Sequence, residues 1–154
     1  MRNVLFALVF SISSLVSVSS FADMVAKEAL PEKVMANLYK RHPDAFDITA
    51  RREKHFNQDL YEIFFKEGEE SLIELYRVNG AFFVNAVLID ASEMVPPSAY
   101  ENLKAAFGDY QVKQAILVVN PNGPGEEYDF TIDASGRIWN VLIDTNGKII
   151  SKES

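Results

Sequence analysis

The chain contains no cysteine, and this absence excludes several kinds of chemistry. It can form no disulfide even in an oxidising compartment, so packing alone must hold the fold. It also offers no thiol nucleophile, no thiolate for a metal site, no attachment point for haem and no N-terminal cysteine to carry a lipid. Chemistry that depends on sulfur is therefore excluded.

Histidine is almost as scarce, with His42 and His55 as the two imidazoles. They do not form a ligand pattern with one another, so we predict no metal site and expect each to be a surface histidine. No serine lies in a G-x-S-x-G context, and the glycine-rich segment Asn120–Glu126 leads into a predicted strand, unlike a phosphate-binding loop. We predict a non-enzyme without catalytic residues or cofactors. A hydrolase using either histidine is the weakest alternative.

Basic residues are outnumbered, with 15 Lys and Arg against 22 Asp and Glu, which gives a net charge of −7. Nucleic acids and anionic membrane surfaces attract basic patches, so neither is a predicted partner. The carboxylate pairs Glu69–Glu70 and Glu126–Glu127 lie in turn-like stretches and are expected to be solvated. A basic partner protein would suit this charge better.

The N-terminus has the pattern of a secretory signal peptide. Arg2 supplies a positive charge, the run Val4–Ser20 is apolar without charged residues, and small residues precede Asp23. The apolar run is short for a membrane-spanning helix and rich in serine. We predict a signal peptide over residues 1–22, cleaved after Ala22, and a periplasmic or secreted protein with no membrane span after cleavage.

The remaining chain predicts two helices and a series of strands. Pro31 suits a first helical position, Val34 and Leu38 share one face of the helix, and Pro43 ends it. The predicted helices are Pro31–Arg41 and Ser98–Phe107. The predicted strands, rich in aromatic and branched residues, are Phe46–Phe56, Leu60–Lys66, Ser71–Val78, Ala81–Ile89, Tyr110–Val119, Glu127–Asp133, Arg137–Ile143 and Lys148–Lys152.

Two short segments near the C-terminus, Asp133–Gly136 and Asp144–Gly147, begin with aspartate and end with glycine. Such a segment is either a calcium loop or a turn. A helix–loop–helix calcium loop needs oxygen ligands at positions 1, 3 and 5, glycine at position 6 and glutamate at position 12, and neither segment fits. Both lie between predicted strands, so we predict turns. Asn79–Gly80 and Asn146–Gly147 are predicted hairpin turns, the first of type I′.

The two halves of the chain resemble one another. Pro31 corresponds to Pro96, and Asn79–Gly80 corresponds to Asn146–Gly147 at a similar offset. This similarity indicates duplication of one supersecondary unit. We predict an α+β fold of two tandem repeats, residues 23–90 and 91–154, each a helix packed on an antiparallel sheet of about four strands.

Aromatic residues make up 12% of the chain and many lie in predicted strands. On a sheet with helices on one face, some of them should point to the open face and offer anchors to a partner. The candidate contacts are Tyr61, Tyr76, Tyr128 and Trp139. Most strand aromatics are nevertheless expected to lie in the core, and the pattern does not say which face is open.

Short phrases in both halves resemble the PepSY-like exported bacterial proteins. They are "LPEKVMANLYKRHPDAFDI" and "LYEIFF" in the first half, and "PPSAYENLKAAFGDYQV", "EEYDFTIDASGRI" and "DTNGKI" in the second. The resemblance implies helix-on-sheet units in tandem, similar to the β-lactamase inhibitor proteins, whose paired sheets bind a partner. It implies no catalytic residues.

These observations favour an exported, non-enzymatic binding module that holds a protein or peptide partner of the cell envelope on its sheet surface. The resemblance adds that the partner could be a protease or hydrolase that the chain inhibits or regulates. The alternative is a periplasmic small-ligand carrier with a cystatin-like or cone-shaped fold, in which a helix and a curved sheet enclose an apolar pocket. A filled interior would exclude the carrier.

Overall fold

The computed structural model describes residues 24–154, apart from the side chains of residues 93 and 94. The predicted signal peptide, residues 1–22, lies outside the described residues. The elements in chain order are β1 (Met24–Val25), a 3-10 turn η1 (Lys27–Ala29), α1 (Glu32–Arg41), β2 (Phe46–His55), β3 (Gln58–Glu67), β4 (Glu70–Arg77), β5 (Phe82–Leu88), α2 (Ala91–Met94), α3 (Pro97–Phe107), β6 (Gln111–Val119), β7 (Glu126–Ala134), β8 (Arg137–Ile143) and β9 (Ile149–Glu153).

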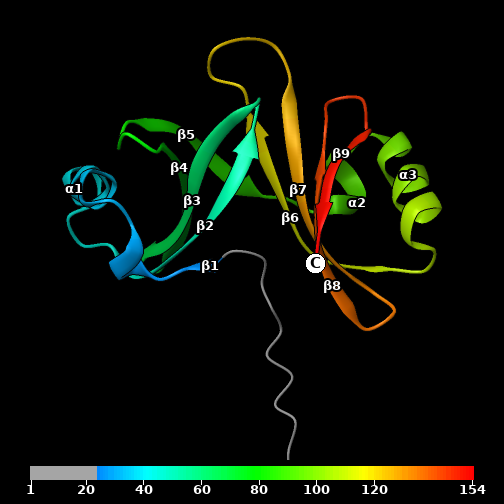
Figure 1. Cartoon of the computed structure of the whole chain (residues 1–154), viewed down its shortest axis with the longest axis horizontal. Coiled ribbons are helices and arrows are strands. Elements are labelled where there is room, and N and C mark those ends of the chain that lie inside the picture. Colours follow the sequence, from blue (N-terminus) through cyan, green and yellow to red (C-terminus); the bar gives the residue numbers. More distant parts are fainter. Residues whose placement is uncertain (1–23) are drawn as a thin grey trace, which may run out of the picture.

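All nine strands belong to one sheet, in which each strand pairs antiparallel with its neighbour in the chain. We call β1–β5 the first arm and β6–β9 the second arm. The arms join through two residue pairs between β5 and β6, Val87 with Leu117 and Leu88 with Ile116. The sheet curls into a half-barrel, which brings β2 and β3 of the first arm toward β7 of the second (Figure 1).

The predicted fold class is wrong. We expected two tandem repeats, each with a helix on its own sheet of about four strands, but the structure has one continuous sheet of nine strands. The sequence pattern identified similar elements in the two halves without showing that β5 and β6 pair across them. The tandem repeat is therefore not confirmed, and the division at residues 90 and 91 stays a prediction.

The individual elements, in contrast, are confirmed closely. The predicted helices correspond to α1 and α3, and each of the eight predicted strands has its counterpart among β2–β9. The two-residue strand β1, the turn η1 and the four-residue helix α2 were not predicted. Among residues 24–154, no helix is long and apolar enough to cross a membrane.

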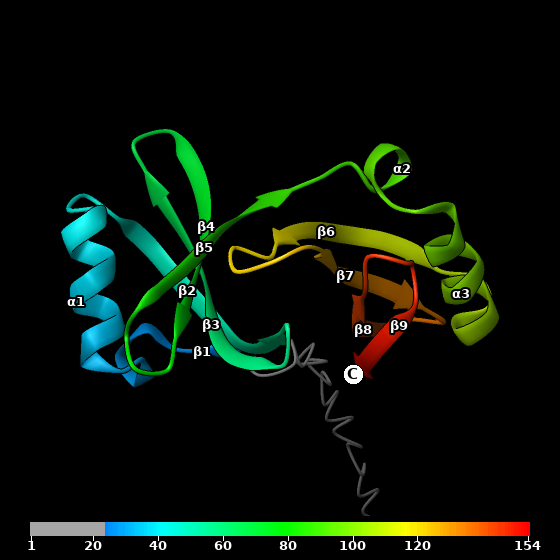
Figure 2. The same ribbon diagram turned by 90° about the horizontal axis from the view of Figure 1, so that it is seen from above.

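The two longer helices cover the outer, convex face of the sheet, at its opposite ends (Figures 1 and 2). Val34 and Leu38 of α1 are fully buried, as are Ala99 and Leu103 of α3. The helices therefore dock through the apolar stripes that the sequence predicts. Strand residues packed beneath them include Ala50, Ile63, Phe65 and Tyr76 in the first arm, and Ala115, Tyr128, Phe130, Ile132, Val141 and Ile143 in the second.

A third apolar cluster lies between the arms, on the inner, concave face. It consists of Leu60, Ile73, Leu75, Phe83, Ala86, Ile116 and Val118. Because this cluster draws residues from both arms, the two halves share a core. It also fills part of the interior in which a small-ligand carrier would hold its ligand, so the structure does not favour that alternative.

Two glycine turns fasten the strands to the helices. Gly80 ends the turn between β4 and β5, and Gly147 ends the turn between β8 and β9. The backbone oxygen of Gly80 accepts a hydrogen bond from Asn37 of α1 at 2.6 Å, and that of Gly147 accepts one from Asn102 of α3 at 2.8 Å. Both hairpin predictions are confirmed. Gly80 has a φ of 94°, but Asn79 is outside the positive-φ region, so the predicted type I′ geometry is wrong.

Candidate functional site

Charged side chains lie on the inner face where an apolar core would be expected. Five of them form what we call the buried polar cluster: Arg51, His55, Glu62, Glu127 and Asp129. Each is 8% exposed or less, whereas we expected His55 to be a surface histidine and Glu127 to be solvated. Both expectations are wrong. Alternation along the strands places Arg51 and His55 on the inner face of β2, Glu62 on that of β3, and Glu127 and Asp129 on that of β7. A buried charge is costly unless it is paired, so the partners of each group matter.

Arg51 connects three strands. Its Nε donates a hydrogen bond to Glu62 Oε2 at 2.9 Å, across the β2–β3 pair in which the two residues are direct partners. One of its terminal nitrogens donates to Asp129 Oδ2 on β7, in the other arm. Burial alone would lower the pKa of Arg51, but Asp129 and Glu62 outweigh it and raise the pKa above its ordinary value. The guanidinium therefore stays charged.

Glu127 holds the hairpin turn between β2 and β3 against the second arm. Its Oε2 lies 2.9 Å from His55 Nδ1, and its Oε1 accepts a hydrogen bond from the backbone N–H of Phe56 at 3.1 Å. Phe56 and Asn57 have φ values of 50° and 61°, the type I′ pattern. A positive φ is costly for an aromatic residue, so the backbone is strained at the point where Glu127 binds it.

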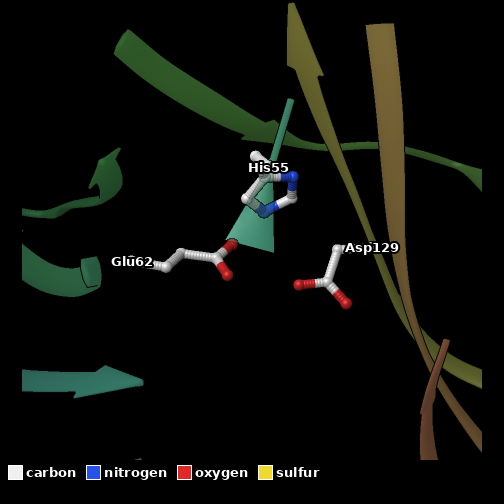
Figure 3. A group of neighbouring side chains, drawn as sticks. All are labelled: His55, Glu62 and Asp129. Carbon is white, nitrogen blue, oxygen red and sulfur yellow. The ribbon is translucent and has the colours of Figure 1, made fainter. Parts of the chain in front are cut away.

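The contact with Glu127 indicates which ring nitrogen of His55 carries the proton. An ionised carboxylate can only accept hydrogen bonds, so the ring nitrogen that faces Glu127, Nδ1, must donate. In the neutral imidazole the other nitrogen, Nε2, then carries a lone pair. That lone pair points into the cluster, toward the carboxylates of Glu62 and Asp129 (Figure 3).

Within the buried polar cluster, three residues each have one buried polar atom without a hydrogen-bond partner: His55 Nε2, Glu62 Oε1 and Asp129 Oδ1. One potential ligand atom from each residue lies within 4.8 Å of the other two. Burial and the negative charge of Glu62 raise the pKa of Asp129 well above its ordinary value, against the opposing effect of Arg51. The arrangement therefore favours a positive species, a proton or a cation, between these groups.

Three residues of the buried polar cluster are closed to substrates in this conformation. His55 and Glu62 are 0% exposed and Asp129 is 1% exposed. A group that acts on a substrate has to touch it, and these three cannot reach a molecule outside the sheet. The chemistry that the cluster supports is therefore internal, the binding of a proton or a small cation.

The four predicted partner contacts lie on the helix-covered side of the sheet. Tyr76 and Tyr128 are 0% and 2% exposed and belong to the cores under α1 and α3. Tyr61 is partly buried, with Arg52 over its ring at 5.7 Å. Trp139 is partly buried against Phe107, at a ring distance of 5.3 Å. The structure does not bring the four together, and their role as contacts stays a prediction.

A second candidate site is a surface groove at the C-terminal end of α1, which we call the acidic groove. It has a volume of about 620 Å³. Its lining consists of Arg41, His42, Glu67, Glu70, Ser71, Leu72, Ile73, Glu74, Asn85, Ala86, Val87 and Leu88. Glu74 accepts hydrogen bonds from Arg41 at 3.0 Å and from Tyr76 at 2.5 Å, and lies 2.9 Å from His42 Nε2. Val87 and Leu88 are 51% and 55% exposed.

Sequence reasoning missed both sites. Arg51 and His55 belong to the charged run "RREKH", which by composition predicts a solvated strand. The residues that bond to them, Asp129 and Glu127, lie far along the chain, so no local spacing could reveal the cluster. A weak signal was present, because Glu62 and Asp129 each alternate with apolar residues that are core on the other face.

No protein-family model matches this chain, and no curated protein matches it. Several solved structures are similar to this chain in fold. A DUF2874 family protein from Bacteroides uniformis is 17% identical with a TM-score of 0.48, covering 80% of this chain and 88% of that chain. A BLIP-like protein from Bacteroides fragilis is 14% identical with a TM-score of 0.44, covering 80% and 84%. A protein from Bacteroides eggerthii, provisionally described as periplasmic, is 16% identical with a TM-score of 0.48, covering 80% and 87%.

The expected resemblance to proteins like the β-lactamase inhibitor proteins thus has a counterpart among solved structures, while the PepSY resemblance is not confirmed. The TM-scores lie below 0.5 and the identities below 20%, so these likenesses carry no activity and no partner over to this chain.

Proposed function

We propose that this chain is an exported, non-enzymatic binding protein that holds a protein or peptide partner against its sheet. The partner binds at the acidic groove. The observation that carries the proposal is the exposure of two adjacent large apolar residues, Val87 and Leu88, at 51% and 55% in the wall of that groove. Apolar side chains gathered in a groove and rimmed by polar groups are typical of interaction sites.

The charges of the groove select the chemistry of the partner. Glu67, Glu70 and Glu74 line it together with Arg41 and His42, so negative charge exceeds positive even when the imidazole is protonated. The whole chain has a net charge of −7. A segment with lysine or arginine beside apolar side chains would complement this surface, and charge complementarity of this kind also speeds association.

The four predicted aromatic contacts remain part of the proposed function. Tyr61 and Trp139 are partly exposed and stay predicted contacts, whereas Tyr76 and Tyr128 are buried and would act by shaping the sheet beneath the helices. A protease or hydrolase of the cell envelope, inhibited or regulated by the contact, is the partner class that we propose. The resemblance stated from the sequence supports that class.

Site-specific photo-crosslinking in the cells that make the protein tests the proposal. A photoreactive amino acid replaces Leu88, and in a matched control it replaces Ile150 on β9, an apolar residue with a similar exposure of 48%. We expect a covalent product of one defined mass from position 88 and not from position 150. Adding Glu70→Lys should weaken the product, because it reverses a charge on the rim of the groove.

Mass spectrometry of the product then identifies the partner and its crosslinked segment. A segment with basic and apolar residues supports the proposal. Equal products from positions 88 and 150, or no product from position 88, would overturn it. The same reagent at Tyr61 and Trp139 tests the aromatic contacts separately.

A further inference from the structure

We propose that His55, Glu62 and Asp129 bind one divalent transition-metal ion of the zinc class between the two arms of the sheet. This inference concerns the inner face and does not depend on the proposed partner site. The three residues come from β2, β3 and β7, and Figure 3 shows their polar ends directed at one common space.

The first argument is the orphaned atoms. His55 Nε2, Glu62 Oε1 and Asp129 Oδ1 are buried and have no hydrogen-bond partner. An unmade hydrogen bond of a buried polar group costs about 1–3 kcal/mol, and more for a charged group. While both carboxyl groups are deprotonated, all three atoms are acceptors and cannot satisfy one another. A metal ion is an acceptor of lone pairs and would satisfy all three at once.

The second argument is the support behind each ligand. The other oxygen of Glu62 and the other oxygen of Asp129 both accept hydrogen bonds from Arg51, and the other nitrogen of His55 faces Glu127. Each side chain is therefore fixed by one polar atom and free at the other. This is how residues behind a metal site orient its ligands, with a carboxylate on the imidazole N–H as the commonest case.

The third argument is charge. Arg51 brings one positive charge against the two carboxylates to which it is bonded, those of Glu62 and Asp129. Glu127, in contact with His55, is a third carboxylate of the buried polar cluster. Unbalanced charge in a buried site is strongly destabilising. With these carboxylates ionised, a divalent cation would offset their excess of negative charge over Arg51.

The donor set indicates the kind of ion. Calcium takes six to eight oxygen ligands and magnesium also prefers oxygen, whereas this site has three protein donors, one of them an imidazole nitrogen. Zinc accepts imidazole and carboxylate together and, among such sites, binds more tightly than manganese or iron. Zinc bonds of about 2.0–2.2 Å would draw the donors closer than their present 4.8 Å limit.

The role that follows is structural. The ligands are 0–1% exposed, so the ion would be shielded from substrates and would join the first arm to the second. No metal site was predicted, because the chain has no cysteine and its two histidines form no ligand pattern. The three ligands meet because β2 pairs with β3 and because the sheet curls.

Zinc titration of the untagged, chelator-treated protein tests the proposal, with calorimetry for affinity and elemental analysis after dialysis for content. We expect one ion per chain. Asp129→Asn keeps the shape but removes a charged ligand, and should weaken binding more than about 100-fold, since loss of an outer partner alone costs about 10–100-fold. His42→Gln is the matched control, because it removes the other histidine and should leave zinc binding intact.

Nitrogen NMR of the wild-type protein tests zinc binding at His55 even if Asp129→Asn fails to fold. The chain has two histidines, so both rings are resolved. Zinc should shift Nε2 of His55 and leave His42 unchanged. The proposal is overturned when zinc is not retained, when it shifts His42 instead, or when folded Asp129→Asn binds as tightly as wild type. Absence of binding together with a fully stable Asp129→Asn would assign the space to a proton.

Discussion

At the scale of single residues, glycine turns and ionisable groups show how local chemistry holds the fold. Gly147 has a φ of 82°, and a Cβ built on it would lie 2.2 Å from Ser98 Oγ and 2.6 Å from the backbone nitrogen of Ala99. Gly136 has a similar φ of 77° with nothing within 4 Å of a Cβ. The two positions therefore separate the cost of backbone conformation from the cost of contact with α3.

We predict that Gly136→Ala lowers the free energy of unfolding by about 1–2 kcal/mol, the cost of a left-handed backbone for alanine. Gly147→Ala should cost roughly 1–3 kcal/mol more, because its methyl group overpacks the start of α3. Urea denaturation of both variants measures the difference. Equal losses would mean that the turn is free to move away from the helix.

His42 makes stability depend on pH. Burial alone would lower its pKa, but contacts with Glu74 and Glu67 outweigh this and raise it above 6.5. Burial alone would raise the pKa of Glu74, but hydrogen bonds from Arg41, Tyr76 and His42 outweigh it and hold that pKa below 4.5. The stability from His42 is thus complete below pH 6.5 and is lost as the pH rises through the raised value. That from Glu74 is present above pH 4.5 and is lost as the pH falls through the lowered value.

We predict that wild-type protein has a higher Tm than His42→Gln at about pH 6, and that the gap narrows by about pH 8 as the imidazole of the folded protein loses its charge. Thermal unfolding followed by circular dichroism across this range measures the gap. A gap that stays constant over the range would show that His42 acts through packing on Phe65, 4.8 Å away between rings, and not through charge.

At the scale of elements, local patterns predicted most of the chain and failed for one kind of strand face. The apolar stripe of α1 and the branched, aromatic run of β3 predicted their elements within a few residues. The sequence predicted β2 as a strand with His55 at the surface, whereas Arg51 and His55 are both buried. The curvature of the whole sheet brings Asp129 and Glu127 on β7 to Arg51 and His55. The alternation of residues along a single strand does not encode that curvature.

The three strands β2, β3 and β7 depend on Arg51. Arg51→Met would leave Glu62 and Asp129 buried without their guanidinium, so we predict a loss of about 3–5 kcal/mol in the free energy of unfolding. Arg52→Met is the matched control: Arg52 is exposed on the opposite face, and its loss should cost less than about 1 kcal/mol. Urea denaturation with a chelator present measures both. Similar values for the two variants would contradict the role of Arg51.

At the scale of the whole molecule, the two arms form a single structural unit. Two residue pairs join β5 to β6, yet the inner apolar cluster and the bonds from Arg51 to Asp129 and from His55 to Glu127 also cross between the arms. The internal similarity of the sequence suggested two repeats, because each half has its own helix and strands. The contacts that unite them involve residues distant in sequence, so the repeat pattern could not reveal them.

Because the two arms share one sheet and one inner core, we predict that they unfold together in one transition. Leu38 of α1 is fully buried, and Leu38→Ala should cost about 2–5 kcal/mol. Trp139, the single tryptophan, lies in the second arm against Phe107. Because the arms share one sheet and one inner core, its fluorescence should report the Leu38→Ala transition at the same lowered urea concentration as circular dichroism does. Lys40→Ala, an exposed change on the same helix, should move neither signal by more than about 0.5 kcal/mol. A Trp139 transition that stays at the wild-type urea concentration would show that the second arm folds without the first.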